Sequence, residues 1–422
     1  MSKKKTGLWM IGACGGVGTT AALGLAALSR GLTSGTSLVT ELELFAPLGL
    51  IEPGQFVVGG HEIRAARFCQ TAQEMHERAG VFSRNVLVGT DDLLVSWGEN
   101  VRPGTVVGSG PAIERLAESG AVRSAATGRE GVEFIKSDIL EFKKNHDLDE
   151  VVVIHVASTE PPIPLTADHE EDARFARALE RSTVGPTTIP SSTLYATAAI
   201  ELGCPYVNFT PSLGASIPVL ERLAKANGTP IAGKDGKTGE TLMKTVLAPM
   251  FLRRNWKILS WVGHNIFGNR DGVVLDDPRH KASKVGTKEQ VVSGIVGYKP
   301  QTLVSIEYIQ SLDDWKTAWD HIHFEGFLGT KMILQFIWQG CDSLLAAPLV
   351  IDLARLILDA KGRGQTGIQS QFASFFKHPE GSQEHDFFRQ WNLLEEHIQG
   401  LVAKGATKGT AAEGSAAKGT SK

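Results

Sequence analysis

The chain has 422 residues, more than a single hydrophobic core usually organises, so we expect about two domains. Hydrophobic residues make up 42% and charged residues 21% of the chain, which excludes disorder over most of its length. The net charge is only -3, from 43 basic and 46 acidic side chains, so no bulk field attracts nucleic acid or an anionic membrane. We therefore expect a small-molecule ligand, and neither a nucleic-acid nor a membrane partner.

The four cysteines, Cys14, Cys69, Cys204 and Cys341, are far apart and form no CxxC pair. This spacing is typical of buried thiols in a reducing compartment, and it predicts a cytoplasmic protein without a structural metal site. The apolar run after the basic amino terminus is interrupted at Gly12, which makes it too short for a signal peptide. No run approaches the roughly 18 apolar residues of a membrane helix.

The first elements in the chain alternate between strands and helices. Residues 8–11 form an apolar run, a glycine-rich turn follows, and residues 19–30 have helical character. Residues 56–58 and 86–88 precede further glycines and are predicted as short strands. Residues 151–157 (VVVIHVA) are predicted as a central parallel strand that is buried on both faces. This repeated strand-helix pattern predicts an α/β fold.

The later part of the chain has a different composition. From about Gly203, loops rich in Gly, Lys, Asp and Asn separate strand-like stretches such as 258–262 and 302–308, which predicts a second domain. Residues 344–360 are mostly apolar and are predicted as a helix that packs against a core. Residues 403–422 are rich in Ala, Gly, Lys and Thr and bury too little apolar area to fold, so we expect a disordered tail.

The glycine-rich turn is the strongest functional signal. Glycines at such a turn let the backbone approach a pyrophosphate, and the following helix presents free N–H groups to the phosphates. The spacing is not a strict GxGxxG, because Cys14 takes the place of the second glycine, and Gly16-Val17-Gly18 before Ala21 offers a GxGxxA alternative. A plain turn that uses glycine only for packing is the competing interpretation. Four glycines in seven residues favour dinucleotide binding, at Gly12, Gly15, Gly16 and Gly18.

The acid that binds the adenosine ribose is expected about 20 residues after the turn, where Glu41 and Glu43 lie in a segment without a clear element. Glu62, just after the strand predicted at 56–58, is the preferred candidate. Function is also expected at the carboxyl end of the central strand, at Ser158, Thr159 and Glu160.

The lysine-rich sequence GKDGKTGETLMKT contains Gly-Lys-Thr but is not a P-loop, because the position of the first P-loop glycine holds Ile231. Lys237 and Lys244 are seven residues apart and share one helix face if the helix begins near Thr238. Two such ammonium groups suit a phosphomonoester and an adjacent oxyanion. The competing interpretation, of equal weight on these residues alone, is a solvated helix with an i,i+4 pair between Glu240 and Lys244.

Further polar residues recur in the same domain. They are Asn265, Asn269 and Asp271 in HNIFGNRDG, Lys281 and Lys284 in HKASK, and Lys331 in FLGTK. Taken singly, each suits an exposed surface. Lysines crowded by other cations have a lowered pKa, which would suit some of them to transfer protons near neutral pH.

Seven motifs, in this order, resemble the myo-inositol-phosphate synthase family over most of residues 6–400. They are GACGGVGTT, VASTE, SSTLYATAAIELGCPYVNFTPS, GKDGKTGETLMKTVLAP, GHNIFGNRDGVVL, SKVGTK and CDSLLAAPLVIDLARL. The chain is compact, like archaeal and bacterial members. It departs from the family pattern at Cys14, at Lys234 before Asp235, and at residues 209–211 (FTP).

The resemblance implies an α/β fold in which a Rossmann-like NAD-binding domain is interrupted by a mixed α/β catalytic and oligomerisation domain. The first domain is expected at 1–200, completed by 332–402, and the second at 201–331, in a homotetramer. The implied reaction converts D-glucose 6-phosphate to 1D-myo-inositol 3-phosphate, the first step of inositol biosynthesis, which supplies phospholipid biosynthesis. In it NAD oxidises C5, a proton leaves C6, the C6 carbanion attacks the C1 aldehyde, and the hydride returns.

The resemblance also implies site residues. Lys237, Lys244, Lys284 and Lys331 would surround the substrate, with Asp235 orienting their ammonium groups. Among them, Lys244 is favoured for the C5 proton and Lys331 for the C1 oxygen. Substrate contacts would come from Asn208, Thr238, Gly239 and Asn265. NAD contacts would come from Gly12, Cys14, Gly15, Gly16, Val17, Gly18, Thr19, Glu62, Ser158, Thr159, Ser192, Asp271, Asp342 and Ser343. A monovalent or divalent cation near the nicotinamide and the substrate phosphate is a further expectation.

Two other functions stay open. One is an ordinary NAD-dependent sugar-phosphate dehydrogenase, which would release NADH as a product. The other is a dinucleotide-sensing or scaffold protein without catalysis, which the intact lysines in every motif disfavour.

Overall fold

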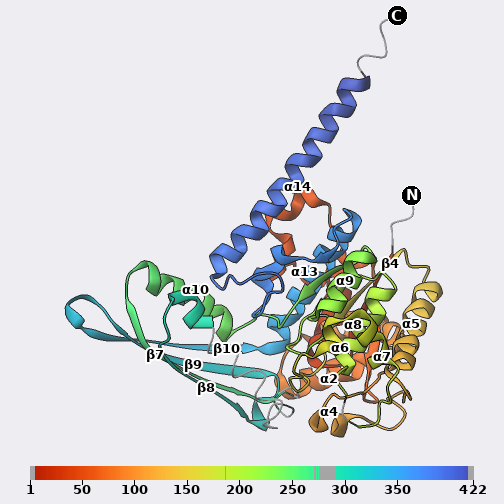
Figure 1. Ribbon diagram of the computed structural model, residues 1–422, viewed down its shortest axis with the longest axis horizontal. Helices are drawn as coiled ribbons and strands as arrows, with labels where there is room; N and C mark the ends of the chain where they lie inside the picture. The colour runs from red at the N-terminus through yellow and green to blue at the C-terminus, as the bar shows by residue number, and fades with distance from the viewer. Residues whose placement is uncertain (1–4, 186, 270–271, 273, 275–290, 417–422) are drawn as a thin grey trace, which may run out of the picture.

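The computed structural model describes residues 5–185, 187–269, 272, 274 and 291–416 (Figure 1). In this part of the chain the strands form a seven-stranded sheet, in which every pairing is parallel, and a mixed four-stranded sheet. The spatial order of the first is β11 (Gly367–Ile368), β6 (Pro230–Gly233), β5 (Tyr206–Asn208), β4 (Glu150–His155), β1 (Thr6–Ile11), β2 (Phe56–Glu62) and β3 (Val101–Pro103). The order of the second is β10 (Lys331–Cys341), β9 (Trp315–Glu325), β7 (Lys257–Phe267) and β8 (Gln301–Tyr308).

The central strands β1 and β4 are the two apolar runs predicted from the sequence. Every residue of β1 is buried, and so are the β-branched residues 151–154 of β4, because helices cover both faces of the sheet. The chain moves outward from β1 to β2 and β3, then returns to add β4, β5 and β6 on the other side. The strand order therefore reverses between β1 and β4, and the carboxyl ends of these strands border the crevice in which open α/β sheets bind ligands.

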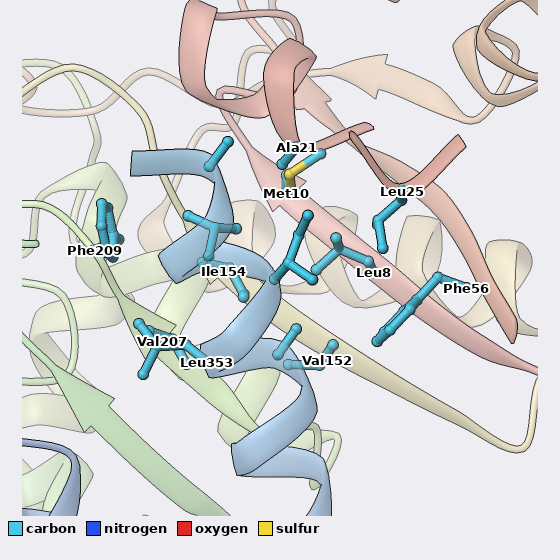
Figure 2. Packing of buried hydrophobic residues seen from close by; sticks show 14 of the residues in the cluster. Leu8, Met10, Ala21, Leu25, Phe56, Val152, Ile154, Val207, Phe209 and Leu353 are labelled. Carbon is cyan, nitrogen blue, oxygen red and sulfur yellow. The ribbon is translucent and has the colours of Figure 1, made fainter. Parts of the chain in front are cut away.

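The helices form a layer on each face of the seven-stranded sheet. On one face, α1 (Gly16–Ser29) and α13 (Asp342–Gly362) pack against β1 and β4, and α5 (Gly128–Asn145) and α8 (Ser191–Glu201) cover the other. Figure 2 shows Leu353 of α13 close to Val152 of β4 and Val207 of β5. The predicted apolar helix at 344–360 therefore returns the chain to the first sheet.

Further helices complete the structure around these layers. They are α2 (Phe68–Ala79), α3 (Arg84–Gly98), α4 (Pro111–Leu116), α6 (Ala167–Glu170), α7 (Asp172–Leu179), α9 (Pro218–Ala226), and the 3-10 helices η1 (Val39–Glu41), η2 (Glu43–Leu48), η3 (Pro53–Gln55), η4 (Gln310–Leu312), η5 (Phe327–Gly329) and η6 (Ser370–Phe375). No helix in the described part of the chain combines the length and apolarity that crossing a membrane requires.

The four-stranded sheet extends away from the seven-stranded sheet and carries α10 (Glu240–Arg253) on one face (Figure 1). Phe251 of α10 lies edge-on to Phe324 of β9, with ring centroids 5.0 Å apart, and also packs against Trp261 of β7. The opposite face is open to solvent, because Ile333 and Ile337 of β10 are 59% and 71% exposed. Among the described residues, this sheet therefore has one packed face and one uncovered face.

Residues 86–88, predicted as a strand, lie inside α3. The Ser83 side chain accepts the N–H of Val86 and caps the helix, and Thr90, Leu94 and Trp97 are buried at helical spacing. The β-branched residues at 86 and 88 do not override this pattern, because Val88 is exposed and has no sheet neighbour.

The predicted domain boundaries do not match the sheets. β5 and β6 follow residue 201 but pair with β4 in the first sheet, whereas β10 lies in the second sheet although residues from 332 were expected to complete the first. β5 and β6 have only three and four residues, and their glycine-rich surroundings have the composition of loops. The chain therefore leaves the first sheet after β6 and returns to it with α13.

The carboxyl-terminal helix α14 (Phe387–Ala416) also differs from the predicted tail. It covers residues 403–416, which the composition assigns to a disordered segment, and it projects from the body of the molecule (Figure 1). Packed residues such as Leu394 and Ile398 already hold the first part of the helix in place. Residues 403–416 extend this helix, so they do not have to nucleate a new one.

Candidate active site

A cavity of about 750 Å³ lies at the carboxyl ends of β1 and β4, within the size range of cofactor and small-molecule sites. It is bordered by the glycine turn after β1, the ends of β2 and β4, the loop after β6, and the first turn of α13. The structure thus places a cavity at the strand-order reversal, and segments from both halves of the chain form its walls.

The glycine turn forms the floor of the cavity. Gly15 caps α1, which begins at Gly16, so the free N–H groups of the helix start at the turn. Gly12 has φ +83, and a Cβ there would lie 2.7 Å from the Cα of Ala157. Only glycine fits at that position. Gly18 and Thr19, predicted as cofactor contacts, lie within α1 and are buried away from the cavity, unlike Gly12 to Val17, of which all but Ala13 line it.

The amino termini of α1 and α13 meet at the cavity. A Cβ on Gly16 would lie 2.5 Å from the Ser343 Oγ, so the two helix ends are in contact. Ser343 is fixed by Asp314, whose carboxylate accepts its hydroxyl at 2.8 Å and its backbone N–H at 3.1 Å. The Cys341 thiol also donates to Asp314, and burial is the main cause that raises the pKa of this carboxyl group. The predicted residues Asp342 and Ser343 therefore reach the glycine turn.

Glu62, the preferred ribose-binding acid, lies at the end of β2 and lines the cavity. Its Oε2 accepts the backbone N–H of Cys14 at 3.1 Å, which ties β2 to the glycine turn. The Cys14 thiol is buried beside it, and this burial raises the pKa of the thiol to about 12. Glu41 instead lies in η1, where it pairs with Arg355 on α13. Of these two acids, Glu62 lines the cavity and Glu41 does not.

The carboxyl end of β4 supplies Ser158, Thr159 and Glu160, all of which line the cavity. Glu160 is buried, and its carboxylate accepts the Ser192 hydroxyl, the Ser192 N–H at 3.1 Å and the Ser109 hydroxyl at 3.0 Å. Burial raises the pKa of Glu160 to about 7. Ser192, predicted as a cofactor contact, does not line the cavity but positions Glu160.

Two lysines that the sequence did not single out lie in the cavity wall. Lys377 donates to the Oδ1 of Asp235 at 2.8 Å, and Lys316 lies 3.8 Å from the Oδ1 of Asp342. The Lys316 ammonium also lies 5.2 Å from the ring centroid of Phe267. Each cavity lysine is thus held by a carboxylate that the sequence did predict.

Lys237 and Lys244 do not share a helix face, because α10 begins at Glu240 and not near Thr238. Neither side chain lines the cavity. Lys244 forms a 2.6 Å ion pair with Glu240, and both side chains are at most 2% exposed. The i,i+4 pair of the competing interpretation therefore exists, but it is buried rather than solvated.

Lys237 points towards α14. Its ammonium donates to the Oε1 of Gln390 and lies 5.4 Å from the ring centroid of Phe387. Burial lowers the pKa of Lys237 to about 7, a value suited to proton transfer near neutral pH. Its neighbours in the chain, Gly236 and Thr238, do line the cavity.

The remaining predicted residues are placed as follows. Lys331 is exposed at the first position of β10, opposite Glu325. The cavity residue Asp342 follows the other end of this strand, eleven residues later, and Lys331 does not line the cavity. Asn208 closes the loop after β5 by bonding Thr210 and Ser212, and it does not line the cavity.

Asn265 lies within β7 and donates to the Ser305 carbonyl at 3.3 Å, away from the cavity lining, and Gly239 caps α10. Thr238, predicted as a substrate contact, lines the cavity. Lys284 and Asp271 lie outside the described residues. Within the described ranges, no group of three or more His, Cys, Asp or Glu side chains is arranged to hold a metal ion.

Lys316 and Lys377 had no local signal in the sequence. Lys316 follows two aspartates at the start of β9, and Lys377 follows two phenylalanines in FFKHPE, so neither belongs to a glycine loop or a helical face. Lys377 reaches the site because residues 376–380 pair with the loop after β6, through bonds such as Lys377 N–H to the Asp235 carbonyl at 2.7 Å. From the sequence, only a search for every lysine close to an acidic or aromatic residue would have selected Lys316 and Lys377.

Comparisons with known proteins agree with the glycine turn and cavity described above, because they identify NAD-binding relatives. A family model of NAD-binding proteins described as myo-inositol-1-phosphate synthase matches residues 6–399. Inositol-3-phosphate synthase 1 of Bacteroides thetaiotaomicron is 32% identical over 425 residues, which cover 95% of this chain and 96% of the relative.

Solved structures share the fold. Inositol-3-phosphate synthase from Caenorhabditis elegans matches with a TM-score of 0.82 at 24% identity, over 94% of this chain and 86% of that chain. A myo-inositol-1-phosphate synthase-related protein from Thermotoga maritima matches with a TM-score of 0.75 at 21% identity, over 94% and 98% of the two chains. With the family model and the bacterial relative, these matches show that the chain belongs to the myo-inositol-1-phosphate synthase family.

Proposed function

We propose that the protein is an isomerase that converts D-glucose 6-phosphate to inositol 3-phosphate and uses NAD within each turnover. The observation that carries the proposal is one cavity in which a dinucleotide-type glycine turn faces the two lysines Lys316 and Lys377. The turn accounts for a cofactor, and the lysines account for an anionic substrate beside it. Relatives named inositol-3-phosphate synthase support this substrate and product.

The residues around the glycine turn fit NAD. The absence of a Cβ at Gly12 and Gly16 lets the backbone approach a pyrophosphate, and the amino terminus of α1 favours its negative charge. Glu62 lies at the end of β2, where a carboxylate accepts hydrogen bonds from the adenosine ribose. When bound, NAD supplies the oxidation at C5 and the reduction that ends the turnover.

Lys316 and Lys377 are proposed to bind the substrate phosphate and to stabilise the oxygen anions that develop at C5 and C1. Both ammonium groups are fixed in advance by carboxylates, Asp342 and Asp235, so their direction does not depend on the substrate. Preorganised cations of this kind stabilise developing negative charge more than flexible ones. Asp235 is proposed to orient Lys377, whereas the resemblance implied this role towards Lys237, Lys244, Lys284 and Lys331.

Lys237 is proposed as the group that exchanges the proton of the C5 hydroxyl. Burial without a described carboxylate partner lowers its pKa to about 7, so a neutral amine is available near neutral pH. Its four-carbon side chain would reach the substrate by rotating past Thr238, which lines the cavity. Lys244 is proposed to fix the first turn of α10 through Glu240. Lys284 and Asp271 stay proposals from the family resemblance alone.

The exposed face of the four-stranded sheet is proposed as the surface through which copies of the chain form a homotetramer. Its apolar residues Ile333 and Ile337 are uncovered within the chain, and exposed apolar patches of this kind mark association sites. The four cysteines form no disulfides, which supports a reducing, cytoplasmic location. There the product would supply inositol for phospholipid biosynthesis.

The proposal is tested by incubating the purified protein with D-glucose 6-phosphate and a small, catalytic amount of NAD. We expect inositol phosphate to accumulate while NADH does not. NADH accumulating in proportion to consumed sugar phosphate would instead show a dehydrogenase, and the absence of both products would show a protein that binds the dinucleotide without catalysis.

A further inference from the structure

One wall of the cavity holds an ion pair between Glu62, at the end of β2, and Arg64 two residues later. The Arg64 Nε lies 3.3 Å from the Glu62 Oε1, and the Nη2 lies 3.3 Å from the Oε2. Both side chains line the cavity, and only 5% of the Glu62 and 12% of the Arg64 side chain is exposed. A ligand that reaches the end of β2 therefore meets a carboxylate and a guanidinium together.

Each member of the pair has an anchor that does not involve the other. The Glu62 carboxylate accepts the backbone N–H of Cys14 at 3.1 Å and that of Ile63 at 3.0 Å. The Arg64 Nη2 donates to the Cys14 carbonyl at 3.0 Å. These contacts are shorter than those within the pair, so either side chain keeps its place when the other is removed.

The two groups prefer opposite ligands. NAD and NADP differ only at the adenosine 2′ position, which carries a hydroxyl in NAD and a phosphate in NADP. A carboxylate accepts a hydrogen bond from the hydroxyl and repels the phosphate, whereas a guanidinium binds phosphate with two N–H groups. While Glu62 is ionised, its charge cancels that of Arg64 and leaves the arginine without net attraction for a phosphate.

We infer that the Glu62–Arg64 pair selects between the two nicotinamide dinucleotides, with Glu62 excluding NADP and Arg64 acting as a 2′-phosphate ligand that Glu62 keeps neutralised. The inference rests on the proposed function only in placing the adenosine ribose at the end of β2. Arg64 would therefore bind a 2′-phosphorylated nucleotide once the Glu62 carboxylate is removed.

The experiment measures the affinity of the full chain for NAD and for NADP by calorimetry, without turnover. Glu62→Gln removes the charge but keeps an oxygen for the Cys14 N–H. We expect this variant to bind NADP more tightly than the unmodified protein by about ten- to a hundredfold, the worth of one hydrogen bond between charged groups. Its affinity for NAD should fall by about tenfold because the ribose loses a charged acceptor.

Two double variants separate the role of Arg64 from the simple loss of negative charge. Glu62→Gln with Arg64→Gln should lose the gained NADP affinity. Glu62→Gln with Arg67→Gln should keep it, because Arg67 bonds the Gly98 carbonyl and does not line the cavity. Melting temperatures of all variants, measured without ligand, confirm that each is folded.

An unchanged NADP affinity in Glu62→Gln would overturn the inference, and so would a gain that survives the loss of Arg64. Equal affinity of the unmodified protein for NAD and NADP would overturn it as well. Failure of the proposed function has a different signature, since the selectivity would change as stated while no inositol phosphate forms from D-glucose 6-phosphate.

Discussion

The Lys377 ammonium lies 2.8 Å from the Asp235 Oδ1 and joins segments that are 142 residues apart in the chain. The backbone supports this contact, because the Lys377 N–H donates to the Asp235 carbonyl at 2.7 Å and the His378 N–H to the Lys234 carbonyl at 3.2 Å. The loop after β6 and the segment before α14 therefore form one wall of the cavity. On this wall a carboxylate sets the direction of a cavity cation.

The first prediction concerns the two cavity lysines. Lys316→Met and Lys377→Met should each lower the rate of inositol phosphate formation on the order of a hundredfold, because each removes a fixed cation that faces developing negative charge. Calorimetry should show little change in NAD affinity for Lys377→Met. Lys331→Met is the matched control and should retain turnover, because Lys331 is exposed outside the cavity. A fast Lys377→Met variant would contradict the assignment.

The second prediction concerns the contact between α1 and α13. Gly16→Ala places a Cβ 2.5 Å from the Ser343 Oγ, so either the Ser343 hydroxyl leaves Asp314 or the two helix ends move apart. Such overpacking costs about 1–3 kcal/mol, and we expect NAD affinity to fall by about tenfold or more. Gly24→Ala in the same helix is the control, since its Cβ would lie at an ordinary 3.6 Å from Ile351. Adding Ser343→Ala to Gly16→Ala should restore much of the affinity. Normal binding by Gly16→Ala alone would refute the close contact.

The third prediction concerns the pH dependence set by Lys237. If its neutral amine is the base, turnover should fall as the pH drops through its lowered pKa of about 7, since protonation removes the base. Gln390→Glu puts a carboxylate beside the ammonium, which stabilises the charged form and should move this limb about one to three pH units higher. Gln399→Glu, an exposed change on the same helix, should leave the profile in place. Identical pH profiles for both variants would exclude Lys237 as the titrating group.

The fourth prediction concerns the uncovered sheet face. Ile337→Asp should dissociate the assembly in sedimentation experiments, because it replaces an apolar side chain that association would bury with a charge. Val88→Asp on α3 is matched in exposure, at 71% for both residues, and should not change the sedimentation coefficient. A protein whose mass in solution is that of one chain, with or without Ile337→Asp, would show that this face is not an interface.

The cofactor half of the site could be predicted because its signal is local. A buried strand, a glycine turn and a helix follow each other directly, and Gly12 meets a steric demand that no other residue satisfies. Glu62 could be chosen for a similar reason, since it ends the next strand of the sheet. Other residues around the turn, such as Asp342 and Ser343, come from a distant segment, and their part in the site was implied by the family resemblance and not by a local signal.

The substrate half could be predicted only in part because its residues come from distant segments. Lys331 is close in sequence to Asp342, but an extended strand of eleven residues carries it roughly 30 Å away, at about 3.3 Å per residue. Lys316, the second residue of β9, pairs with Gly340 near the far end of β10, and this antiparallel register places it at the cavity. Strand register and the return of residues 376–380 decide which lysines line the cavity, and neither is a local property of the chain.

The most direct test of the account compares the amounts of product and cofactor after a reaction with D-glucose 6-phosphate in large excess over NAD. Phosphorus NMR measures the inositol phosphate formed, and the near-ultraviolet absorbance measures NADH. The account predicts many equivalents of inositol phosphate per NAD and no accumulation of NADH. Formation of NADH in step with the loss of sugar phosphate, with no inositol phosphate, would contradict it.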